Sequence, residues 1–167
     1  MSINFYKMAN VYFSENFISV SASSLGSLYY FESDFQPVIL DKDCTDEQLG
    51  LAVLKALEHS KQISIEEFSE GFNAGIFKEG YNKYINFLMM RYNCKNKKQF
   101  FKKIKEVTIS KIDNNFQLLS THQNSTGSFS ANNSSQVISI ETSTSPTVLG
   151  KLARDAYKGC TSVYDRK

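Results

Sequence analysis

The fold of this chain is indicated by a stretch that occurs twice, first as Thr45-Asp46-Glu47-Gln48-Leu49-Gly50 and then, 100 positions later, as Ser145-Pro146-Thr147-Val148-Leu149-Gly150. Each copy opens with a hydroxyl residue that can cap a helix. Thr45 and Gln48 have the spacing of a capping box, and Pro146 suits a first helical position. Each copy follows a short β-rich run, at 38–40 or 137–140, and continues into apolar residues at helical spacing. We therefore expect two strand–helix units on one sheet, with helices at 45–60 and 146–160, and we expect the glycines to allow close approach to that sheet.

The rest of the chain extends this pattern on both sides. Residues 1–40 hold further β-rich runs separated by Ser, Asn and Gly, and residues 106–120 predict two strands joined at Asp113-Asn114-Asn115. Residues 77–104 have helical periodicity and should provide two more helices. Residues 120–136 are rich in Ser, Asn and Thr and predict a long loop around Phe129. The expected fold is α+β, a single domain over 1–167 with a mostly antiparallel sheet and helices packed on it.

Composition excludes several classes of protein. The chain has 167 residues, of which 41% are hydrophobic, so it can bury a core of ordinary size. Its apolar runs reach four residues, whereas a membrane span needs roughly 18 or more. The first residues lack the apolar core of a secretory signal. Three widely spaced cysteines, Cys44, Cys94 and Cys160, do not make a disulfide framework. We expect a protein of the reducing cytoplasm.

Charge is unevenly distributed along the chain. Residues 1–79 carry 12 acidic and 5 basic side chains, a net charge of −7, and residues 80–167 carry 5 acidic and 14 basic ones, a net charge of +9. The span 91–111 has eight positive charges against one negative charge, Glu106. Such polarity is typical of a protein that meets a charged partner, and equally of an amphipathic structure with solvated faces.

No pattern of catalytic residues stands out. The two histidines are His59, on the polar side of the first capped helix, and His122, in the Ser/Asn-rich segment. A nucleophilic pair of Cys94 and His122 remains open, but such distant residues occur together in most proteins. The carboxylates Glu66, Glu67 and Glu70 could be imagined as catalytic, although a solvated helix face explains them better. We expect a binding protein without catalytic activity, cofactor or metal.

The basic span 91–111 supports an alternative function in nucleic-acid binding, because Lys and Arg neutralise phosphates while aromatic side chains stack on bases. Phe100, Phe101 and Ile104 have the spacing of core residues, however, and would leave only lysines outside. No nucleic-acid-binding motif accompanies them.

Several of these segments together resemble the contact-dependent growth inhibition (CDI) immunity proteins of the CdiI type. The resemblance lies in the basic helix Lys97-Lys98-Gln99-Phe100-Phe101-Lys102-Lys103-Ile104-Lys105, the strand pair 106–120, the strand 137–140 and the helix that opens at Thr144 and ends near Cys160. The helix that opens at Thr45 fits the same family. These parts cover about two-thirds of the chain, and the resemblance lapses at 61–80 and 121–135.

The resemblance implies an inhibitor that acts by binding. Members of the family bind the C-terminal toxin domain, often a nuclease, that a neighbouring cell delivers. The expected partner is therefore a cognate CDI toxin domain in a 1:1 complex, with no membrane and no nucleic acid involved. A nuclease cleft is basic, so an acidic surface suits its inhibitor. Five carboxylates, of which four lie in the variable acidic segment 61–80, are the expected toxin-binding residues: Asp34, Glu66, Glu67, Glu70 and Glu79.

Overall fold

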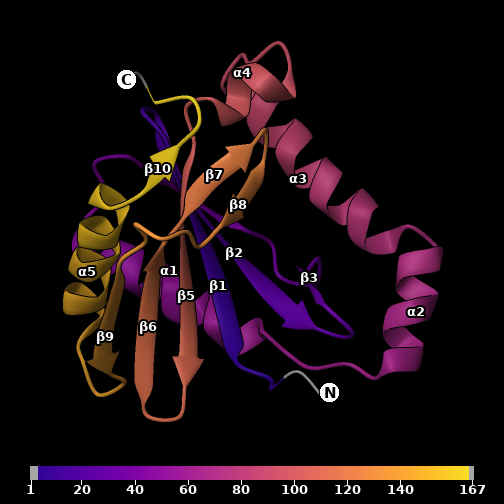
Figure 1. The fold of residues 1–167 in the computed structure, drawn as a ribbon, viewed down its shortest axis with the longest axis horizontal. Coiled ribbons are helices and arrows are strands. Elements are labelled where there is room, and N and C mark those ends of the chain that lie inside the picture. Colours follow the sequence, from indigo (N-terminus) through magenta and orange to yellow (C-terminus); the bar gives the residue numbers. More distant parts are fainter. Residues whose placement is uncertain (1–3, 166–167) are drawn as a thin grey trace.

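A computed structural model describes residues 4–165 of the chain. Its main sheet has the order β3-β2-β1-β5-β6-β9, and β4 pairs with β2 beside β3. All strand pairs of this sheet are antiparallel (Figure 1). The strands are β1 (Lys7–Phe13), β2 (Phe17–Leu25), β3 (Tyr29–Phe31), β4 (Val38–Asp41), β5 (Lys105–Ile112), β6 (Asn115–Ser120) and β9 (Val137–Glu141). The α+β class and the antiparallel sheet are as predicted.

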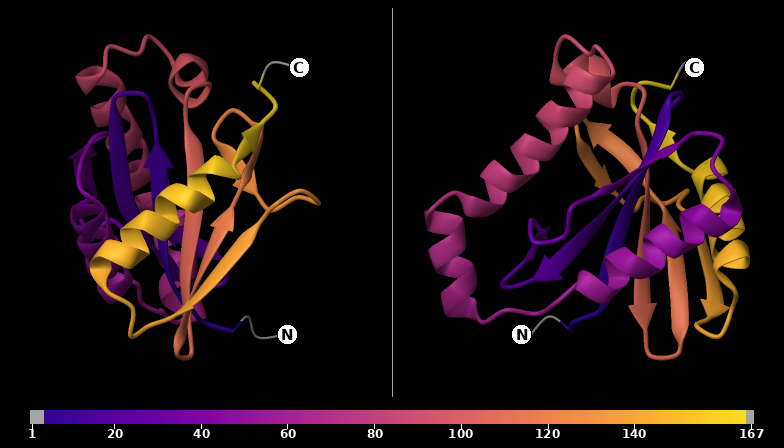
Figure 2. Two further views of the ribbon diagram at one scale, coloured as in Figure 1. Left: turned by 90° about the vertical axis from the view of Figure 1, so that its left-hand side faces the viewer. Right: turned by 180° about the vertical axis from the view of Figure 1, so that it is seen from behind.

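Alternation along the strands gives the main sheet two different faces. Val11, Val20, Ile109 and Leu118 point to one face, where they form the principal core with α1 (Asp46–His59) and α5 (Pro146–Lys158). The neighbouring residues of the same strands, such as Asn10 and Thr108, point to the other face. Figure 2 shows that α1 and α5 both lie against one face of the sheet. The opposite face is therefore left to the segments that join these elements.

The two helices begin as their sequences indicate. The Thr45 hydroxyl accepts from the Gln48 amide at 3.1 Å, and the Gln48 side chain accepts from the Thr45 amide at 2.9 Å, which completes the capping box. Ser145 caps α5 by accepting from the Val148 amide at 3.2 Å, with Pro146 at the first position. These bonds use helix N–H groups that otherwise lack a partner.

The glycines in these helices have a different role from the one we expected. A Cβ atom on Gly50 would lie 1.8 Å from the carbonyl oxygen of Pro146, and a Cβ atom on Gly150 would lie 1.8 Å from that of Asp46. The close approach is thus between α1 and α5, where the helices cross, and not between a helix and the sheet. Each helix places its glycine against the first turn of the other.

The repeat extends well beyond the two helices. The β1–β2 pair Phe13–Ile18 corresponds to the β5–β6 pair Lys111–Phe116, 98 positions later. The offset rises to 100 further along: the β2–β4 pair Ile18–Leu40 corresponds to the β6–β9 pair Phe116–Ile140, in which Phe116 keeps the offset of 98 and Ile140 has the offset of 100. β1 and β5 join the halves, with Asn10 opposite Thr108. Because these two residues are themselves 98 positions apart, a local two-fold axis passes through this pair.

The segment between the halves forms an arm. It contains α2 (Ile65–Asn73), α3 (Ile76–Arg91) and α4 (Lys97–Phe101), and Figure 1 shows α2 and α3 standing beyond β3. Tyr84, Ile85 and Leu88 of α3 pack with Phe100 and Phe101 of α4 in a second core on the open face of the sheet. The basic helix is shorter than its sequence predicted, because Lys102 and Lys103 form the turn that leads into β5.

The expectation of a long loop at 120–136 is wrong. This segment contains β7 (His122–Ser125) and β8 (Ser128–Ser130), which form a hairpin, and β10 (Thr161–Ser162) pairs with β7 in parallel. Gly127 has φ of +75°, the left-handed conformation that such a tight turn requires. The buried Gln123 side chain donates to the Phe101 carbonyl at 2.9 Å and ties the hairpin to α4.

Candidate functional site

A groove of about 710 Å³ lies on the face of the main sheet opposite α1 and α5. Its floor comes from β1 and β5, through Met8, Asn10, Tyr12, Glu106 and Thr108. One wall is the β7–β8 hairpin, and the other is β3 with the α2–α3 arm. β3 and β8 are both terminal strands of their sheets. A groove with two walls of such different origin can accept a segment of another molecule.

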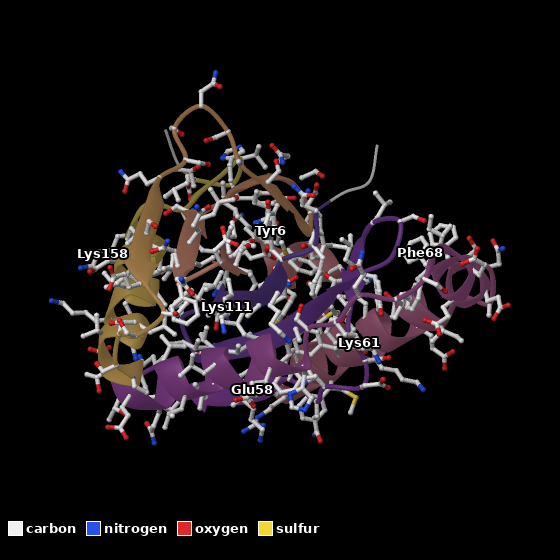
Figure 3. The ribbon with its side chains drawn as sticks, turned by 90° about the horizontal axis from the view of Figure 1, so that it is seen from below. Tyr6, Glu58, Lys61, Phe68, Lys111 and Lys158 are labelled. Carbon is white, nitrogen blue, oxygen red and sulfur yellow. The ribbon has the colours of Figure 1, made fainter. Side chains whose placement is uncertain are left out.

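Aromatic side chains make up most of the arm-side wall. Tyr30 of β3 stacks on Phe77 of α3 with ring centroids 4.1 Å apart, and Phe68 packs beside them. Figure 3 shows Phe68 on α2, at the end of the molecule away from Lys158. Phe72 and Leu28, which also line the groove, are 66% and 62% exposed. Exposed large apolar side chains around a concave surface are typical of a protein-binding site.

The groove lies on the local two-fold axis that relates the two halves. Asn10 and Thr108, through which the axis passes, are both in its floor. Other lining residues are also related by the repeat, with offsets of 98 or 100: Met8 and Glu106, Ser21 and Leu119, Ser23 and Thr121, Tyr29 and Phe129, Tyr30 and Ser130. The positions are equivalent but the residues differ, so a symmetric frame carries an asymmetric surface.

Glu106 is the one carboxylate among the described residues that line the groove. Its Oε1 accepts from the Thr108 hydroxyl at 3.2 Å, and no ion pair to it occurs among residues 4–165. Burial of the carboxyl group raises its pKa to about 7, against a smaller lowering by the Thr108 hydrogen bond. Glu106 was not among the residues predicted from sequence, where it was only the one negative charge in a basic span. Its position on the polar face of a strand was the available signal.

The structure separates the expected toxin-binding carboxylates into two groups. Glu66, Glu67 and Glu70 are exposed on α2, whose Phe68 and Phe72 line the groove. Asp34 instead pairs with Lys61 at 2.9 Å and Glu79 with Lys83 at 3.1 Å, and neither lines the groove. None of the five carboxylates lines the groove itself: the three on α2 are exposed on a helix that contributes to its wall, while the other two charges are already partly balanced.

Similarity to known proteins bears directly on this site. The sequence profile of the family CdiI, CDI immunity protein, matches residues 7–160. The chain belongs to the CdiI family. The match is wider than the two-thirds that the resemblance covered, and it includes both 61–80 and 121–135.

Two solved structures share the fold of this CdiI-family chain. A protein of unknown function from Neisseria meningitidis has a TM-score of 0.85 at 20% identity, covering 96% of this chain and 99% of its own. The CdiA-CT/CdiI toxin and immunity complex from Yersinia pseudotuberculosis contains a chain with a TM-score of 0.80 at 20% identity, covering 95% and 99%. No curated protein matches the chain.

The candidate catalytic residues of this CdiI-family chain do not come together. His122 bonds through Nδ1 to the Thr161 hydroxyl at 2.8 Å, whereas the Cys94 thiol donates to the Tyr92 carbonyl at 3.8 Å. His59 is exposed on α1 and bonds to the Lys55 carbonyl at 2.9 Å. Burial raises the pKa of Cys160 to about 11, which keeps that thiol protonated and unreactive. Within residues 4–165, no three His, Cys, Asp or Glu side chains are placed to hold a metal ion.

The basic span is arranged as a solvated surface over a core. Phe100, Phe101 and Ile104 are buried, as their spacing predicted, and the lysines around them are exposed. Lys103 pairs with Glu15 and Lys105 with Asp165, which balances part of the charge. The aromatic side chains needed to stack on bases are thus inside the protein at this surface. No helix in the described part of the chain is long and apolar enough to cross a membrane.

Proposed function

We propose that this protein binds and neutralises the C-terminal toxin domain of a cognate CDI system, in a 1:1 complex in the cytoplasm, by occupying the toxin's active site. It acts by binding and needs no cofactor. Membership of the CdiI family supports the immunity function, and a chain of the same fold occurs in a toxin and immunity complex of Yersinia pseudotuberculosis. The observation that carries the proposal is the groove, which has exposed apolar residues at its edge and, in its floor, a carboxylate that pairs with no basic side chain of residues 4–165.

The groove has the layout of a protein interface. Phe72 and Leu28 provide exposed apolar area beside the stacked Tyr30–Phe77 pair, and binding energy concentrates at such aromatic centres. The exposure of Phe72 gives the interface an apolar centre. Glu66, Glu67 and Glu70 lie on the same helix and form the acidic rim.

The toxin is in our proposal a nuclease, because an acidic rim complements the basic cleft in which a nuclease holds phosphates. Rim charges act mainly by accelerating association, and salt screens their effect. The test uses Glu66→Lys with Glu70→Lys and leaves Glu67 unchanged, since Glu67 accepts from the Ser64 amide in the α2 capping box. The control is Glu58→Lys with Glu141→Lys, which changes the net charge equally on exposed residues of α1 and β9.

The experiment measures binding of the purified toxin domain encoded beside this chain, by calorimetry and by light scattering after gel filtration. We expect a 1:1 complex whose affinity falls at least tenfold in the α2 double variant, while the control pair changes it less than threefold. Cells that produce the toxin domain should survive with the wild-type protein. A wild-type protein that neither binds nor protects would refute the immunity function. If the two double variants lower the affinity equally, the α2 carboxylates are not part of the interface, and we would place its charged rim on the hairpin at 121–135.

A further inference from the structure

Glu106 stands out because its partly buried carboxylate forms no ion pair with any of residues 4–165. The buried Glu32 accepts from the Ser24 hydroxyl at 2.7 Å and lies 3.6 Å from the Lys61 ammonium group. Glu106 has only the Thr108 hydroxyl, although it lies in the floor of an open groove. A carboxylate that is largely withdrawn from water without gaining a counter-ion is costly to the folded state. The presence of Glu106 at this position therefore calls for a reason outside the isolated fold.

The other half of the chain shows that the fold does not need an acid at this position. The residue related to Glu106 by the repeat is Met8, which lies 98 positions earlier in the corresponding strand and also lines the groove. The structural bonds of Glu106 use its backbone carbonyl, which accepts from the Thr121 hydroxyl at 2.6 Å and the Cys160 thiol at 3.2 Å. These bonds do not depend on the side chain.

The groups that face Glu106 are neutral near pH 7. Tyr12 from β1 and Tyr81 and Tyr84 from α3 have pKa values that burial raises above their ordinary value, and burial likewise keeps the Cys160 thiol at the end of α5 protonated. Lys105, the preceding residue of β5, pairs with Asp165, and Lys78 is exposed at the arm-side wall of the groove. The carboxylate is thus the one negative charge of a site lined by hydroxyl groups and aromatic rings.

We propose that Glu106 is the anchor for a single cationic side chain, a lysine or arginine, that the toxin domain inserts into the groove. This inference rests on the proposed function and adds the chemistry of the contact. An ammonium or guanidinium group would supply the missing counter-charge, and such a charge-assisted bond is strong when water is excluded. The tyrosine hydroxyls of Tyr12 and Tyr81, 3.2 Å apart, can accept a further N–H bond, and the aromatic wall can cover the aliphatic part of the cation.

The test compares Glu106→Gln and Glu106→Met, the latter copying the residue of the other half, with Glu141→Gln as a control that removes one exposed charge from β9. Affinity for the purified cognate toxin domain and thermal unfolding are measured on each variant. We expect both Glu106 variants to lose at least about thirtyfold in affinity, while their unfolding temperature at pH 8 rises. The control should change neither. A merely structural role would instead lower stability together with affinity, and would refute the inference.

Two further measurements separate this inference from the proposed function. Wild-type affinity should fall as the pH is lowered from 8 to 6, because protonation removes the anchor's charge, and the Glu106→Gln variant should lack this dependence. Replacing the toxin's lysines and arginines one at a time by Gln and Met should find one whose effect disappears in the Glu106→Gln background. If the wild-type protein and the Glu106→Gln variant bind the toxin domain with equal affinity, this inference alone is overturned. If the wild-type protein does not bind the toxin domain, both the inference and the proposed function are overturned.

Discussion

Replacement of Gly50 by alanine should destabilise the protein by about 2 kcal/mol, although alanine is the better helix former. An ideal Cβ on Gly50 lies 1.8 Å from the Pro146 carbonyl oxygen and 2.6 Å from its carbon. Relief of this contact requires α1 and α5 to separate by more than 1 Å at their crossing. The neighbouring Leu49 and Leu149 are fully buried in the core between the helices and the sheet.

The magnitude follows from the packing that is lost. A gap of about 0.5–1 Å forfeits a quarter to a half of the contact energy of the atoms that line it, and overpacked cores lose typically about 1–3 kcal/mol. We take the upper end of this range, about 3 kcal/mol, as the packing energy lost at the α1–α5 crossing, because backbone atoms cannot move aside as a side chain can. The gain in helix propensity offsets about 1 kcal/mol. The net loss of about 2 kcal/mol is a substantial part of a typical stability of about 5–15 kcal/mol.

Urea denaturation followed by circular dichroism measures this loss directly. The repeat provides a second, independent test, because Gly150→Ala meets the Asp46 carbonyl at the same distance of 1.8 Å and should cost the same. The double variant should cost less than the sum, since both substitutions open one crossing. The control is Leu51→Ala on the exposed side of α1, which should change stability by less than about 0.5 kcal/mol. An increase in stability for either glycine variant would refute the reasoning.

Three other predictions concern the groove and its surroundings. Because the folded protein holds the Glu106 proton up to about pH 7 and the unfolded chain releases it near pH 4.5, stability falls as pH rises through that window. Removal of the carboxyl group in Glu106→Gln should therefore raise the free energy of unfolding by about 2–3 kcal/mol at pH 8 and by almost nothing at pH 4.5, and equal gains at both pH values would contradict this. Phe72→Ala, at an exposed position, should leave urea stability unchanged within about 0.5 kcal/mol and weaken toxin binding by about 2 kcal/mol; a loss of stability instead would show that the ring serves the core. The double variant Lys98→Glu/Lys102→Glu should bind the toxin with an affinity within threefold of wild type. If the wild-type protein binds RNA and this double variant does not, the nucleic-acid alternative is favoured.

The features that could be predicted from sequence are those determined by neighbours along the chain. The Thr45 and Ser145 caps, the strands of the first forty residues and the buried stripe of Phe100, Phe101 and Ile104 all rest on local spacing. The role of Gly50 was misread because it depends on residues about 100 positions away. Local composition also misled at His122–Ser130, where Ser and Asn suggested a loop but long-range contacts, such as that from Gln123 to α4, hold a hairpin.

The candidate site was only partly predictable for a related reason. Charge density drew attention to Glu66, Glu67 and Glu70, which do lie on the helix beside the groove. Glu106 could not be predicted because what distinguishes it is the lack of a basic partner within residues 4–165. That lack becomes apparent only in the folded protein, where the sheet, α3 and the hairpin surround the carboxylate. Phe72 could not be placed either, since the period of α2 does not state which of its aromatic rings meets the body of the protein.

The two-fold axis through Asn10 and Thr108 is what a homodimer would have if its subunits were fused into one polypeptide. In a true homodimer, a binding surface on the two-fold axis has the same residue at each pair of related positions, because every mutation appears in both subunits. Fusion removes that restriction. Glu106 can differ from Met8, and Ser130 from Tyr30, while the paired strands and crossed helices beneath them stay alike. In such a scaffold, a single substitution can change the binding surface on one side only, which suits a toxin domain that is itself asymmetric.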